Sequence, residues 1–66
     1  MDQSRMIEQI LAFVEQHQES QATRSVCRRI LGAHPGRITR ETLLDLEHRL
    51  KTAEPEEVEA CYYLIK

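Results

Sequence analysis

The stretch DQSRMIEQILAFVEQHQE, residues 2–19, decides the fold class of this chain. When it is placed on a helix at about 100° per residue, its large apolar side chains fall within an arc of about 160°. An arc this broad is a face that packs against other elements, because a helix of this length is marginal alone in water. Asp2 or Ser4 can cap the helix start. The apolar face consists of Met6, Ile7, Ile10, Leu11, Phe13 and Val14.

A second helical pattern follows Ser20 and ends at Gly32. Glycine suits that position because it adopts the left-handed conformation that closes many helices. One side of this predicted helix is apolar and the other is basic. The apolar side holds Ala22, Val26, Cys27, Ile30 and Leu31, and the opposite side displays Arg24, Ser25, Arg28 and Arg29.

A third helix is predicted after Thr39, whose hydroxyl can accept from free amides of the first turn. Ile38 before this cap and Leu43 after it have the spacing of a hydrophobic staple. The apolar stripe spans only about 80°, which is closer to a coiled-coil seam than to a broad core face. Leu44 lies outside it. The stripe is made of Leu43, Leu46, Leu50 and Ala53.

The last helix begins near Pro55, a residue suited to the first helical position, and Glu56 and Glu57 complement the helix dipole there. Tyr63 falls on the outer side. No stretch alternates apolar and polar residues as a half-buried strand does, so the pattern predicts an all-α chain. We expect one domain, residues 1–66, built as a compact bundle of about four short helices with antiparallel neighbours. Val58, Cys61, Tyr62, Leu64 and Ile65 are expected to face inward.

A chain of 66 residues buries only roughly 60% of its unfolded surface, which leaves a thin core and favours self-association. Two cysteines do not form the disulfide framework of a small secreted domain. No signal segment and no apolar run of membrane-spanning length is present. We therefore expect a cytoplasmic protein with reduced thiols and no membrane contact.

Charge is distributed in three blocks. The formal net charge is −3 for residues 1–19, +5 for residues 20–40 and −4 for residues 41–66, which gives −2 for the whole chain. Such asymmetry fits contact with nucleic acid, pairing with the chain's own acidic ends, or an acidic protein partner. The basic surface consists of Arg24, Arg28, Arg29, Arg37 and Arg40.

Binding of DNA or RNA through a helix-turn-helix formed around residues 31–46 is one hypothesis. The turn is longer than the usual 3 to 4 residues, and Glu41 and Asp45 occupy the outward face of the would-be recognition helix. The arginines can still contact phosphates without reading sequence. No aromatic residues are interleaved with them for base stacking.

Metal, cofactor and catalytic chemistry find little support in the pattern. The histidines and cysteines lack the spacing of metal ligands, and Cys27 and Cys61 are expected to be structural core residues. His17 falls on the apolar stripe near a helix end, and His34 is expected to be exposed in a turn. No nucleophile has an evident base or cleft. We expect no enzyme activity, metal, cofactor or small-molecule substrate.

Binding to another macromolecule is the remaining class of function. We expect a non-catalytic regulatory or adaptor protein that binds a protein partner through its helices and forms a homo-oligomer. The alternative is a small DNA- or RNA-binding regulator that uses the five arginines. The expected partner-binding residues are Leu43, Leu44, Leu46, Leu50 and Tyr63.

Overall fold

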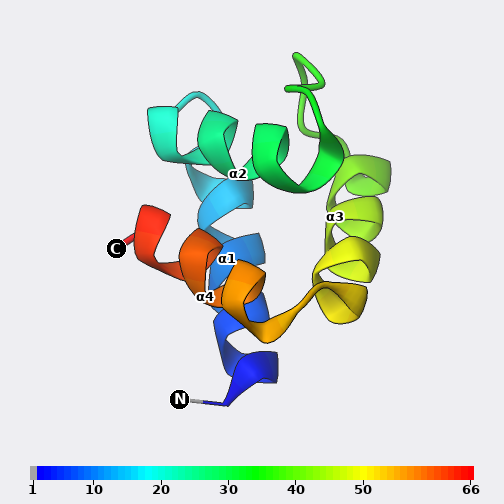
Figure 1. Ribbon diagram of the computed structural model, residues 1–66. Helices are drawn as coiled ribbons and strands as arrows, with labels where there is room; N and C mark the ends of the chain where they lie inside the picture. Colours follow the sequence, from blue (N-terminus) through cyan, green and yellow to red (C-terminus); the bar gives the residue numbers. More distant parts are fainter. Residues whose placement is uncertain (1) are drawn as a thin grey trace.

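The protein folds into a helical bundle. In the computed structural model, which describes residues 2–66, four helices account for most of the chain (Figure 1). Within that range no residue lies in a strand, so the all-α prediction is confirmed. The helices are α1 (Gln3–Gln16), α2 (Gln21–Leu31), α3 (Arg40–Thr52) and α4 (Pro55–Leu64).

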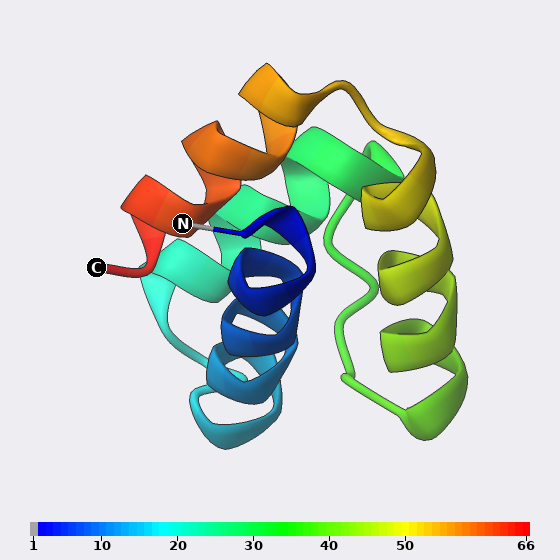
Figure 2. The same ribbon diagram turned by 90° about the horizontal axis from the view of Figure 1, so that it is seen from below.

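The first two helices pack on the last two. Both α1 and α2 contact α3 and α4, whereas the consecutive pairs α1–α2 and α3–α4 contact each other least (Figures 1 and 2). The bundle is therefore held together largely by helices distant in sequence. Residues 32–39, which connect α2 to α3, contribute Ile38 to the core.

The core draws buried side chains from every helix. The predicted inward residues of α1, α2 and α4 are buried or partly buried, with one exception. Leu64 is 39% exposed, so the prediction that it faces inward is wrong. It is the last residue of α4, where no other helix covers it. The buried apolar residues are Met6, Ile7, Ile10, Val14, Val26, Cys27, Ile38, Leu46, Leu50, Val58, Cys61 and Tyr62.

Local backbone and side-chain features explain where α2 begins and ends and where α3 begins. The hydroxyls of Ser20 and Thr39 accept from backbone amides in the first turns of α2 and α3, as the sequence predicts for Thr39. Gly32 closes α2 with φ +89°, a conformation that L side chains rarely adopt. Asp2 is the N-cap of α1, but its side chain makes no capping bond.

Thr23 is a buried polar residue that apolar periodicity does not reveal. Its side chain is fully buried on α2. The hydroxyl donates to the carbonyl of His17 at 2.6 Å and accepts from the Ser20 hydroxyl at 3.1 Å. This chain of bonds ties the end of α1 to the start of α2, and it satisfies a polar group that would otherwise be costly to bury.

We expect Thr23→Val to lower the free energy of unfolding by about 1–2 kcal/mol, because it keeps the shape but removes the hydroxyl. Urea denaturation followed by circular dichroism measures this loss. Thr52→Val is the control, since the Thr52 hydroxyl bonds only to exposed carbonyls of its own helix. Equal effects of the two substitutions would contradict a special role for Thr23.

Candidate functional site

The structure divides the predicted partner-binding residues between surface and core. Leu44 and Tyr63 are 57% and 66% exposed, which confirms that both lie off the core faces. Leu43 is partly buried. Leu46 and Leu50 are fully buried, so assigning them to a partner surface is wrong. Their stripe on α3 packs against the chain's own helices, which leaves no part of either side chain accessible.

Leu44 and Tyr63 do not belong to one surface. Leu44 lies on α3, and Tyr63 lies at the carboxyl end of α4. That end of α4 is on the far side of the molecule from α3 in both views (Figures 1 and 2). A single helix-sized interface therefore includes one of them and not both.

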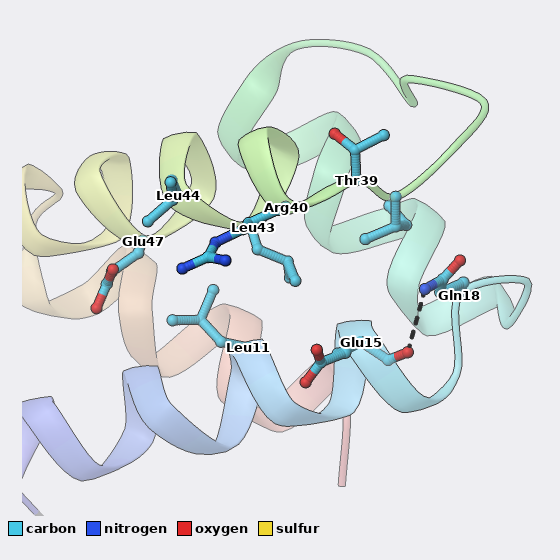
Figure 3. A pocket seen from close by; sticks show the side chains of 9 residues that line it. Leu11, Glu15, Gln18, Thr39, Arg40, Leu43, Leu44 and Glu47 are labelled. Atoms are coloured by element: carbon cyan, nitrogen blue, oxygen red, sulfur yellow. Dashed lines mark hydrogen bonds between the residues drawn. The ribbon is translucent and has the colours of Figure 1, made fainter.

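An open groove of about 430 Å³ lies between α1 and α3, beside Leu44. We call it the α1–α3 groove. Leu11 of α1, Leu43 of α3 and Ile38 before α3 supply its apolar surface, and Leu44 stands on its α3 side (Figure 3). Its lining is Leu11, Glu15, Gln18, Ile38, Thr39, Arg40, Leu43, Leu44 and Glu47.

Charged side chains border this apolar strip. Glu15 borders it from α1, and Arg40 points from α3 into the space above Leu11 (Figure 3). Glu47 on α3 forms an ion pair with Lys51, with 3.4 Å between Lys51 Nζ and Glu47 Oε2. An apolar centre with charges on both sides is the usual composition of a protein-binding surface, in which the charges fix orientation more than they add affinity.

Sequence periodicity did not predict this groove, although the positions of two leucines in the apolar arcs are a signal for it. Leu11 and Leu43 each lie at one edge of their helix's apolar arc rather than at its centre. Side chains at the edge of an arc are the ones that neighbouring helices cover incompletely. Both are accordingly partly buried, whereas Ile10 and Leu46, nearer the arc centres, are fully buried.

The five arginines do not form one continuous basic surface. Arg29 forms an ion pair with Glu57 of α4, and Arg40 lies in the α1–α3 groove with two carboxylates. Arg24 and Arg28 line one hollow over α2, and Arg24 and Arg37 line another. The acidic ends of the chain thus meet part of the basic block.

The two cysteines lie in the core with free, fully buried thiols, as predicted. Burial raises the pKa of Cys27. Burial also raises the pKa of Cys61 to about 11, with a further increase from Glu57 and an opposing effect of Arg29. Both thiols are therefore held in the protonated form, which is the unreactive one.

The burial of His17 and His34 differs from what the sequence pattern indicated: His17, on the apolar stripe, is exposed, and His34 is partly covered. His17 is the exposed C-cap residue of α1, and its ring lies 4.6 Å from that of Phe13. The expectation that His34 is exposed is wrong. It is half-buried because its Nδ1 accepts from the Gly36 amide at 3.0 Å, which folds the ring against the turn.

Two further findings concern residues 2–66. None of the helices in this range has the length and hydropathy that crossing a membrane requires. Nor do three or more His, Cys, Asp or Glu side chains gather there as a metal site would need. In comparisons with known proteins, no family model, no curated protein and no solved structure matches this chain. Its own surface is therefore the basis for assigning a function.

Proposed function

We propose that this chain is a non-catalytic adaptor or regulatory protein that binds a helix of a protein partner in the α1–α3 groove. The observation that carries the proposal is the exposed Leu44 beside an open apolar strip. A large apolar side chain that is more than half exposed is common alone, but it gains significance next to further apolar surface in a hollow.

The shape and chemistry of the groove favour a helix as the occupant. Its two walls are helices, and an amphipathic helix fills such a groove with apolar residues at i, i+3 or i+4, and i+7. A second hollow between the same two helices, lined by Ile7, Glu8 and Lys51 among others, extends the surface. Partner charges opposite Glu15 and Arg40 would set the direction of binding.

Self-association is part of the same proposal. Every copy of the chain carries Leu44 and the groove, and a 66-residue chain has a small core to which an interface adds buried apolar area. We also propose a cytoplasmic location, where the two free thiols would stay reduced.

Selection of helical peptides from a displayed library tests the groove. We expect the wild-type protein to enrich peptides with the i, i+3/i+4, i+7 apolar spacing. Leu44→Glu should weaken their binding by about tenfold or more, because it places a charge against an apolar face. Tyr63→Glu is the matched control, since it puts the same charge at another large exposed hydrophobic residue, which lies outside the groove.

The outcomes separate the proposal from its alternatives. If no spaced peptides are enriched, or if Leu44→Glu and Tyr63→Glu bind them equally well, the groove is not the binding surface. Sedimentation of the same variants reports self-association, which Leu44→Glu should weaken if it uses the groove.

The alternative of a DNA- or RNA-binding regulator is less well supported. It needs the arginines to act together, but Arg29 is paired with Glu57, and Arg40 lines the α1–α3 groove together with Glu15 and Glu47. Glu41 and Asp45 are exposed on α3, where they would face the phosphates if that helix entered a groove of DNA.

A further inference from the structure

The hollow that Arg24 and Arg37 line is more polar than the α1–α3 groove and lies between the turn after α1 and the connection from α2 to α3. Its volume is about 200 Å³. We call it the loop hollow. We propose that it binds a phosphate group, held by Arg24, Arg37 and the ring of His34. The lining residues are Gln18, Glu19, Arg24, His34, Gly36, Arg37 and Ile38.

His34 provides the first observation. Its Nδ1 accepts a hydrogen bond from the Gly36 amide, so that nitrogen carries no proton and the proton lies on Nε2. Among the described residues, this Nε2 is the one buried side-chain nitrogen or oxygen without a hydrogen-bond partner. A buried donor left without an acceptor is unfavourable and calls for a partner that the protein itself does not supply.

The arginines provide the second observation. Arg24 comes from α2 and Arg37 from the connection, so the hollow receives cations from two separate elements. Neither guanidinium takes part in an ion pair or a side-chain hydrogen bond within residues 2–66, whereas Arg29 and Arg49 each bind a carboxylate. A free guanidinium presents a planar fork of donors that matches the oxygens of a phosphate.

The three groups together define the class of ligand. Two guanidinium groups and one N–H are all donors, and the ligand must therefore offer several acceptor oxygens and negative charge. A phosphate monoester or diester has both properties. His34 Nε2 is covered in the unliganded chain, so the turn around Gly36 has to move for a phosphate oxygen to reach it.

Glu19 opposes binding and makes the proposal easy to test. Its carboxylate lines the loop hollow together with Arg24 and Arg37. A bound phosphate would be repelled by this charge. Removing the charge should therefore strengthen binding, an effect that loss of folding cannot mimic.

Titration with inorganic phosphate, followed by NMR of backbone amides and histidine rings, measures binding. We expect saturable shifts at the Gly36 amide and the His34 ring. Arg24→Gln and Arg37→Gln should each weaken phosphate binding about tenfold, which corresponds to about 1.4 kcal/mol, and Glu19→Gln should strengthen it. Arg49→Gln is the control, because it removes another exposed arginine, one that pairs with Asp45 outside the hollow.

Two outcomes would overturn the proposal. One is the absence of saturable shifts at Gly36 and His34. The other is equal weakening by Arg24→Gln and Arg49→Gln, which indicates only a general effect of net charge.

A DNA duplex added in a parallel titration identifies the source of the phosphate. Binding no tighter than that of inorganic phosphate points to a small phosphate ester. Tighter binding that falls steeply with salt and requires Arg28 points to a nucleic-acid backbone, since Arg28 and Arg24 line the adjoining hollow.

Discussion

Leu46→Ala is expected to lower the free energy of unfolding by about 2–5 kcal/mol, whereas Leu44→Ala changes it by less than about 0.5 kcal/mol. The two leucines are two positions apart on α3, but Leu46 is fully buried and Leu44 is 57% exposed. Shortening Leu46 leaves a cavity that the surrounding helices close only in part. Shortening Leu44 leaves no cavity.

The loss at Leu46 is large for a chain of this size. A domain of 66 residues has a total stability of about 3–10 kcal/mol, so Leu46→Ala should remove a substantial share of it. Urea unfolding of both variants, followed by circular dichroism, measures the difference. Similar losses would show that α3 does not turn its stripe toward the other helices, and Leu46 would again be available to a partner.

The same pair of leucines shows how far periodicity can predict this fold. The apolar arcs correctly indicated four helices and most of the core, since burial of an arc is set by local spacing. They did not indicate what covers each arc. The narrow stripe of α3 resembles a coiled-coil seam, but it is covered by the chain's own helices, and only Leu43 at its edge reaches the groove.

Contacts between residues distant in sequence were not predictable either, because local spacing does not indicate which elements meet. The Arg29–Glu57 ion pair joins residues 28 positions apart, and charge blocks alone do not show which acid meets which base. The groove likewise depends on Leu11 and Leu43 meeting across two helices. The burial of His34 depends on a local turn. Gly36, at φ +81°, brings its amide to the His34 ring, and the amino-acid composition of the segment does not specify this turn.

The thiols of the folded chain are expected to react at least about 100-fold more slowly with a disulfide reagent than those of the unfolded chain. The thiolate is the reacting form. With the pKa of Cys61 raised from 9.0 to about 11, its thiolate fraction at pH 8 falls from about one in ten to about one in a thousand. Full burial of both thiols slows reaction further. Cys27→Ala isolates the rate of Cys61, measured in buffer and in denaturant.

The raised thiol pKa also makes stability depend on pH in a defined direction. Above about pH 9 the unfolded chain releases the Cys61 proton, while the folded chain keeps it until about pH 11. The contribution of this thiol to the free energy of unfolding should therefore be fully present below pH 9 and decrease as the pH rises toward 11. Glu57→Gln should reduce this decrease slightly, because burial rather than Glu57 is the larger cause of the shift. Rapid reaction of Cys61 at pH 8 without global unfolding would instead mean that α4 detaches locally, since this thiol is fully buried while α4 is packed.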